Sequence, residues 1–181
     1  MGEWKTIKLS DVITTNADTY SIKENWSYVN YLDTGNITEN VIAEIQHIDA
    51  VEKLPSRARR KVKYNSIVYS TVRPNQQHYG IIKNIPDNFL VSTGFAVIDV
   101  DETKADADYI YFWLSQSDIV THLHAIAEQS VSAYPSIKPS DIENLEICLP
   151  DLETQHKIAS VLLSLSDKMT ANTKINDNLA A

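Results

Sequence analysis

The 181-residue sequence is poor in the residues on which most cofactor-binding motifs depend. Its four glycines, at positions 2, 35, 80 and 94, are too scattered to form the turn that wraps a phosphate group. This spacing excludes a Walker loop and a dinucleotide-binding turn, and no Asn-Pro-Pro-aromatic motif of an adenine-amino methyltransferase occurs. The single cysteine, Cys148, excludes a disulfide framework, and its apolar surroundings predict a buried thiol.

The histidines, serines and carboxylates show no catalytic pattern. His122 and His124 are two residues apart, so on a helix they would point to different faces and could not share a metal ion. No nucleophile-elbow motif surrounds a serine, and no carboxylate cluster accompanies a lysine as in metal-dependent nucleases. We expect no catalytic residue, no metal site and no cofactor.

Long apolar runs are also absent. No run approaches the ~18 residues that span a bilayer, and the N-terminus lacks the apolar core of a signal peptide. The composition, 43% apolar and 22% charged, is typical of a soluble globular protein. We expect a cytoplasmic chain without a membrane partner, built as one domain plus an extension.

Residues 1–149 alternate irregularly between strand-like and helical segments, which predicts a mixed sheet rather than repeated βαβ units. Leu54-Pro55-Ser56 is expected to begin a short helical turn that carries the next three arginines. The fold class is therefore α+β, a mixed-sheet domain followed by a long helix. The expected strands are 26–32, 41–48, 65–72, 78–83, 89–91, 94–99 and 145–149, and the expected helices are 106–114, 117–127 and 140–143.

Residues 150–181 favour one long helix. Pro150 pre-sets a helix start, and the next 29 residues contain no glycine or proline. Such a helix would be roughly 43 Å long. It could pack on its own domain or pair with another helix as a coiled coil, in which Asn172 would fix the register. Its apolar seam comprises Ile158, Val161, Leu162, Leu165, Met169, Asn172, Ile175 and Leu179.

The net charge of −8 argues against a nucleic-acid partner, but the positive charge is concentrated. All four arginines lie between Arg57 and Arg73. A local basic face can bind phosphates in a salt-sensitive way, although such a run can also be an ordinary solvated surface. The expected phosphate contacts are Arg57, Arg59, Arg60, Lys61 and Lys63.

The segment after residue 72 is dense in side chains that read base edges. Arginine matches guanine with two hydrogen bonds, and asparagine or glutamine matches adenine in the same way. The alternative is a polar turn between two strands. Tyr69, Tyr79 and Tyr134 could pack on sugars or bases. The candidate base readers are Arg73, Asn75, Gln76, Gln77 and His78.

Several segments together resemble the specificity (S) subunits of type I restriction-modification systems. The most specific is Leu149-Pro150 followed by Gln155-His-Lys-Ile-Ala159 at the head of the long helix. The resemblance extends to Trp4 near the start, Tyr69-Ser-Thr-Val-Arg-Pro74 in the middle, and Tyr134-Pro-Ser-Ile-Lys138 before the last strand.

The resemblance implies a non-catalytic subunit of half the usual length. Residues 1–149 would be one DNA target recognition domain, with Tyr134 and Lys138 among its double-stranded DNA contacts. Residues 150–181 would be the helix that dimerises the chain and docks adenine-methyltransferase (M) subunits. A restriction (R) subunit would join when cleavage is required. A homodimer would then read a bipartite, palindromic site.

Other functions stay open. The chain could be the recognition module of a fused restriction enzyme, a protein–protein adaptor, or an acidic DNA mimic that inhibits restriction. A mimic should display carboxylates broadly, which the basic segment interrupts. An adaptor has no need for the base readers.

Overall fold

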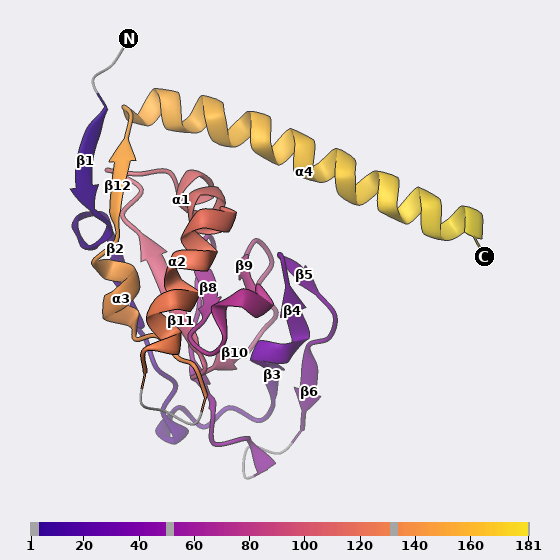
Figure 1. Cartoon of the computed structure of the whole chain (residues 1–181). Coiled ribbons are helices and arrows are strands. Elements are labelled where there is room, and N and C mark those ends of the chain that lie inside the picture. The colour runs from indigo at the N-terminus through magenta and orange to yellow at the C-terminus, as the bar shows by residue number, and fades with distance from the viewer. Residues whose placement is uncertain (1–3, 50–52, 131–133, 181) are drawn as a thin grey trace.

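The computed structural model describes residues 4–49, 53–130 and 134–180, with side chains up to residue 176. Strands and three short helices form a layered domain, and one long helix leaves it (Figure 1). The start of this helix lies beside the first and last strands, and its end projects away from the domain.

The central sheet is antiparallel and buried on both faces. Its strand order is β2 (Ile13–Thr15), β11 (Phe95–Val100), β8 (Ile67–Ser70) and β9 (Tyr79–Ile81). Ile67 and Tyr69 belong to a core shared with the helices, whereas Val68 belongs to a second core toward the other sheet. Alternate side chains of a strand point to opposite faces, which explains why this strand is apolar throughout.

A second four-stranded sheet lies behind the first. Its order is β6 (Gln46–Ile48), β3 (Val29–Leu32), β10 (Phe89–Ser92) and β7 (Ala58–Arg60), and only the β3–β10 pairing is parallel. Two small antiparallel pairs complete the described strands, namely β1 (Lys5–Lys8) with β12 (Glu146–Leu149), and β4 (Ile37–Thr38) with β5 (Val41–Ile42).

Helices cover the outer face of the central sheet (Figure 1). They are α1 (Ala107–Leu114), α2 (Ser117–Glu128) and α3 (Pro139–Glu143). The α1 helix begins where Asp106 accepts a hydrogen bond of 2.7 Å from the Tyr109 N–H, a standard cap for an orphan donor. On their inner faces, Ile110 and Leu114 of α1 and Leu123 of α2 are fully buried.

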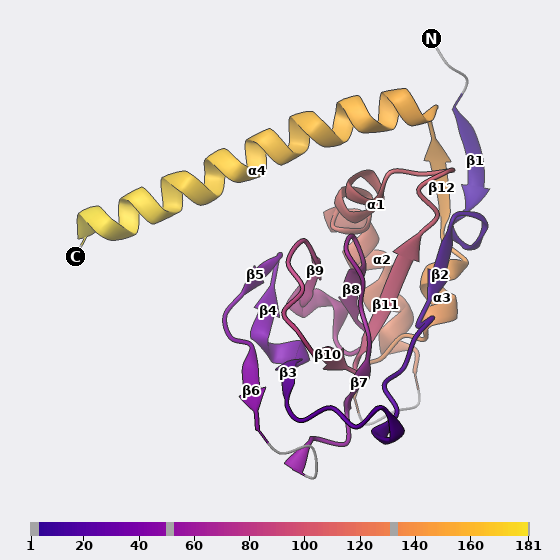
Figure 2. The same cartoon turned by 180° about the vertical axis from the view of Figure 1, so that it is seen from behind.

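The last helix, α4 (Leu152–Ala180), begins at β12. The Asp151 carboxylate caps it by accepting a hydrogen bond of 2.8 Å from the Thr154 N–H. Gln155 and Ala159 are buried against the domain, Leu162 and Leu163 are half-buried, and residues 164–176 are exposed. Figures 1 and 2 show the distal half extending freely from the domain. Within the described part of the chain, no helix is long and apolar enough to cross a membrane.

The α+β class, the long helix and the β8–β9 hairpin are confirmed. Three local predictions are wrong. The Cys148 side chain is exposed, because Ile147 and Leu149 take the inward positions of β12. The arginines expected on a helical turn lie in and before β7, which pairs with β10. The strand expected at 41–48 is two short strands, β5 and β6.

Candidate nucleic-acid interface

The tip of the β8–β9 hairpin is a fixed loop. A short 3-10 helix, η5 (Pro74–Gln76), is flanked by Arg73 and Gln77, both in the left-handed backbone region at φ of 50° and 56°. That region is unusual for residues with a side chain, and it is held here by hydrogen bonds. The Gln76 N–H donates to the Arg73 carbonyl at 2.9 Å, and the Gln77 N–H donates to the Pro74 carbonyl at 3.0 Å. Asn75 and Gln76 are therefore presented to solvent from an ordered backbone.

A segment 60 residues further along the chain lies against this loop. The Arg73 N–H donates to the Pro135 carbonyl at 2.9 Å, and the Ile137 N–H donates to the Thr71 carbonyl at 2.8 Å. The Arg73 guanidinium lies over the Tyr134 ring, 5.4 Å from its centroid. Tyr134 is 60% exposed, so this cation–π pair stands on the surface. The structure thus brings together two residues that the sequence proposed separately.

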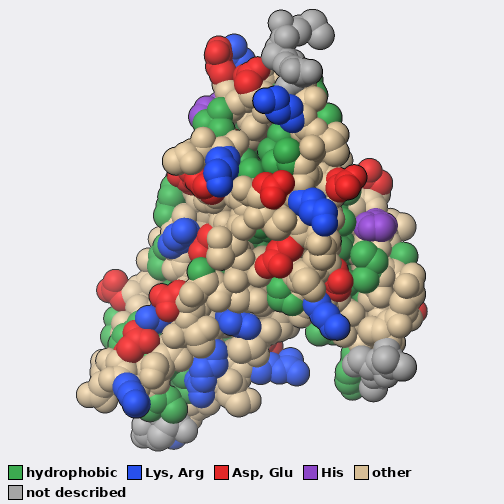
Figure 3. Space-filling view, turned by 90° about the vertical axis from the view of Figure 1, so that its left-hand side faces the viewer, with side chains coloured by type: hydrophobic (Ala, Val, Ile, Leu, Met, Phe, Trp, Pro, Cys, Tyr) green, Lys and Arg blue, Asp and Glu red, His purple; other side chains and the backbone are tan. Residues whose placement is uncertain are grey.

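Arg57 joins the same end of the domain. The Thr93 N–H donates to the Arg57 carbonyl, and the Thr71 N–H donates to the Gly94 carbonyl, each at 2.8 Å. Lysine and arginine side chains gather toward the end of the molecule opposite the N-terminus, where the surface is hollowed (Figure 3). We call the surface at these strand ends the recognition edge. It comprises Arg57, Arg73, Asn75, Gln76 and Tyr134.

Two candidate base readers help to hold the loop, His78 through its side chain and Gln77 through its backbone carbonyl. His78 is half-buried, and its Nδ1 lies 2.6 Å from the Ile37 carbonyl, which can only accept, so this nitrogen carries the proton. The Gln77 carbonyl accepts a hydrogen bond of 2.9 Å from the Glu39 N–H. These contacts attach the hairpin tip to β4 and its turn, and they use the side chain of His78 but only the backbone of Gln77.

Two of the three candidate tyrosines are core residues. Tyr69 and Tyr79 are buried and stacked, with ring centroids 5.4 Å apart. Burial raises the pKa of both phenols above the ordinary value. The expectation that they pack on sugars or bases is wrong, because they fill the space between the sheet and α1.

The remaining basic residues do not form one continuous face. Arg59 and Arg60 are neighbours on a strand and point to opposite sides, with Arg59 bonded to the Ala58 carbonyl and Arg60 to the Thr19 hydroxyl. Lys63 precedes β8 and Arg73 follows it, so they lie at opposite ends of that strand. Lys63 is 3.6 Å from an Asp99 oxygen.

Lys61 is paired with acid. Its Nζ lies 2.6 Å from Glu24 Oε2 and 3.8 Å from Asp18 Oδ2. The hydrogen bond with Glu24 raises the pKa of Lys61 and lowers the pKa of Glu24. Lys138 is exposed just before α3, and its N–H donates to Asp141 Oδ2 at 2.7 Å. A phosphate near Lys61 would have to compete with two carboxylates.

The proposed seam of α4 divides into two parts. Ile158 and Leu162 are half-buried and, with Trp4, Phe112 and Trp113, line a hollow of about 360 Å³ between the helix and α1. Val161, Leu165, Met169 and Ile175 are 60%, 53%, 70% and 55% exposed. Asn172 is exposed between them, and the side chain of Leu179 lies outside the described part. The first turns of the helix therefore pack on its own domain, whereas pairing of the distal half with another helix stays a prediction.

A buried polar residue at the start of α4 was given no role in the sequence. Gln155 is 1% exposed and bridges the helix to the domain. The available signal was a polar side chain on the apolar face, at the spacing of Ile158, Ala159 and Leu162. Among the described residues, no group of three His, Cys, Asp or Glu side chains converges as metal ligands would.

The chain thus combines two four-stranded sheets, an ordered polar loop at one edge and a projecting helix. The family model "Type I restriction modification DNA specificity domain" matches residues 1–181. The chain belongs to this family, which confirms the predicted family.

Curated and solved relatives agree with this membership. The chain is 29% identical over 179 residues to the specificity subunit of the type I restriction enzyme HindI from Haemophilus influenzae, covering 99% of this chain and 39% of that protein. The HsdS subunit from Thermoanaerobacter tengcongensis has the same fold, with a TM-score of 0.79 and 26% identity over 95% of this chain and 44% of that one.

A second solved structure comes from work on complex assembly and conformational transition of the type I restriction-modification system. It has a TM-score of 0.79 and 25% identity, over 96% of this chain and 44% of that one. The chain therefore spans about two-fifths of the length of these relatives.

Proposed function

We propose that residues 1–149 are a DNA target recognition domain that reads one half of a bipartite site. The observation that carries this proposal is the recognition edge, where Arg73 is held over Tyr134 beside the exposed amides of Asn75 and Gln76. An arginine and two amides on one ordered loop can read guanine and adenine edges in the major groove. Arg57 on the neighbouring strand end would contact the phosphate backbone.

The helix of residues 150–181 would carry the assembly. Its exposed apolar side chains continue the face that begins against the domain, so a second helix could cover both. A second copy of this chain, related by a two-fold axis, supplies such a helix and restores two recognition domains. The chain would then be a homodimer that recruits adenine-methyltransferase (M) subunits, and a restriction (R) subunit where cleavage occurs. The chemistry would belong to those subunits, which must extrude the target adenine from the duplex.

Two identical domains related by a two-fold axis contact two identical half-sites. The expected target is therefore an interrupted palindrome whose spacer depends on the length and direction of α4. Lys61 and Lys63, which lie away from the recognition edge or are paired with acid, would add at most sequence-independent attraction.

Selection of random-sequence DNA by the purified complex of this chain with its M subunit tests the proposal. The expected result is one enriched interrupted palindrome, lost in the Arg73→Ala complex and kept in the Lys104→Ala complex. Lys104 is a matched exposed cation, paired with Asp101 at the other end of the domain. Enrichment of no sequence at either low or moderate salt would contradict DNA recognition and favour an adaptor or a DNA mimic.

A further inference from the structure

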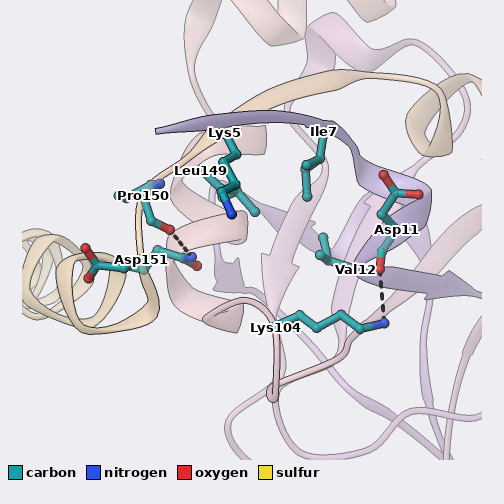
Figure 4. A pocket seen from close by; sticks show the side chains of 9 residues that line it. Lys5, Ile7, Asp11, Val12, Lys104, Leu149, Pro150 and Asp151 are labelled. Atoms are coloured by element: carbon teal, nitrogen blue, oxygen red, sulfur yellow. Dashed lines mark hydrogen bonds between the residues drawn. The ribbon is translucent and has the colours of Figure 1, made fainter. Parts of the chain in front are cut away.

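One buried side chain fixes α4 to the domain. Gln155 Oε1 accepts a hydrogen bond of 2.9 Å from the Asp106 N–H, and Gln155 Nε2 donates one of 2.8 Å to the Pro150 carbonyl. Both polar atoms of the amide are thus used, one on Asp106 of the domain and one on Pro150, which lies between β12 and α4. Figure 4 shows the hydrogen bond to Pro150 beside Leu149 and Asp151, at the edge of a hollow of about 750 Å³. We call Gln155, Asp106 and Pro150 the clamp.

The residue on the domain side of the clamp is itself fixed. Asp106 Oδ1 accepts from the Tyr109 N–H at 2.7 Å, which makes Asp106 the N-cap of α1. His156, the next residue of α4, places its Nε2 3.3 Å from Asp106 Oδ2. Gln155 and His156, which are consecutive in α4, therefore both contact Asp106 at the start of α1. The clamp therefore joins the first turn of α4 to the start of α1.

A small change of the angle between α4 and the domain displaces the C-terminal end of the helix most. Only the first turns of α4 touch the domain, so the direction of the helix depends on few contacts. A tilt of about 10° would move the end of a roughly 43 Å helix by about 7 Å, or about two base pairs of DNA. In a dimer the tilt occurs in both protomers.

We propose that Gln155 is a positioning residue that sets the spacer of the bipartite site by fixing the angle between α4 and the recognition domain. It touches no DNA and acts through the clamp. This inference rests on the proposed homodimer, and the experiments below distinguish its failure from the failure of that dimer. The variant Gln155→Met keeps the length and volume of the side chain and removes both hydrogen bonds. Gln155→Glu keeps the acceptor toward Asp106 and loses the donor toward Pro150.

The geometry can be measured without DNA. Cys148 is the single cysteine and is exposed on β12, so a spin label there reports the distance between the two domains of a dimer. Full antiparallel pairing of α4 would place the two labels about 50 Å apart. We expect one narrow distance distribution for the wild type and a broadened or shifted one for both Gln155→Met and Gln155→Glu, since the latter places a buried carboxylate oxygen against the Pro150 carbonyl. Identical distributions would overturn the inference, whereas no intermolecular distance in the wild type would overturn the dimer.

The functional readout is the spacer itself. DNA libraries that hold two copies of the selected half-site with every spacer length would be bound by each complex. We expect the wild type to prefer one spacer by at least tenfold over its neighbours, and Gln155→Met to bind neighbouring spacers within threefold while reading the same half-sites. An unchanged spacer preference, with or without weaker binding overall, would show that Gln155 is only a core contact.

Two control variants distinguish a role of Gln155 in orienting α4 from a general loss of domain stability and from the effect of a Gln→Met substitution as such. Val91→Ala weakens a different hydrophobic cluster, away from α4, and should lower binding without changing the spacer. Gln129→Met makes the same chemical change at an exposed position after α2 and should leave both readouts unchanged. A broadened spacer preference in Val91→Ala would overturn the assignment to Gln155.

Discussion

Placing a charge on the exposed seam of α4 should separate the proposed dimer. Leu165 is 53% exposed although it belongs to an apolar row with Val161 and Met169. In a monomer this position faces water, so Leu165→Asp should leave the fold of the chain intact. In a dimer the same position would lie against the partner helix.

The expected loss follows from the exposed area. Full burial of a leucine side chain is worth ~1.5–3 kcal/mol, so covering the exposed half gives about 1 kcal/mol in each protomer. Loss from both protomers is about 2 kcal/mol, or roughly a 30-fold rise in the dimer dissociation constant. Desolvation of two carboxylates adds to this, so 30-fold is a lower bound.

Sedimentation equilibrium over a wide concentration range measures this constant directly. We expect a concentration-dependent dimer for the wild type and a monomer for Leu165→Asp at the same concentrations. Ser166→Asp adds the same charge at the neighbouring exposed position and should stay dimeric. An unchanged mass for Leu165→Asp would refute the seam and place any dimer contact elsewhere.

The remaining predictions concern the recognition edge, the acid-paired lysine and the packing of the hairpin. Arg73→Ala should weaken binding of the selected target by ~1–3 kcal/mol and binding of random DNA little, measured by fluorescence anisotropy; equal losses would make Arg73 a phosphate contact. Lys61→Ala should reduce the affinity for DNA of every sequence alike. Glu24→Gln should raise that affinity, because it frees the Lys61 ammonium from its carboxylate partner. The slope of affinity against salt concentration measures both effects, and a sequence-selective change would contradict the assignment. Gly80→Ala should destabilise the domain by about 1–3 kcal/mol in thermal unfolding, because an added Cβ would lie 2.5 Å from Ile37 Cδ1. Gly35→Ala, with no atom within 4 Å of its added Cβ, is the control, and equal losses at both positions would refute the packing argument.

Periodicity was sufficient to predict the elements whose burial follows one simple pattern. The row from Ile158 to Ile175 repeats at helical spacing, and the run around Ile67 to Tyr69 is β-branched and aromatic, so both elements were predicted correctly. The expected helix start at residue 106 is also close, since Asp106 caps α1.

Pairing across long sequence distances could not be predicted. Arg59 lies in a strand and Arg57 just before it, because residues 58–60 pair with β10 some 30 residues later. The strand propensity of the local sequence does not reveal such a pairing. The same is true of Cys148, whose exposure depends on the register of β12 against β1.

The sequence predicted which residues could belong to the recognition edge, but not how they contact one another. Arg73, Asn75 and Gln76 could be proposed from residue types alone, but the cation–π contact of Arg73 with Tyr134 exists only because residues 134–137 run beside the hairpin. Residue type also could not separate an exposed reader from His78, whose ring is committed to the Ile37 carbonyl.

The most direct test is the DNA methylation produced in cells in which this chain is the only specificity subunit supplied to its M subunit. Genome-wide mapping of methylated adenines gives the recognised sequence without assumptions. A homodimer of two identical recognition domains predicts a single interrupted palindrome, with one methylated adenine in each half-site at symmetric positions. A non-palindromic bipartite motif, or one continuous motif, would contradict the two-fold arrangement.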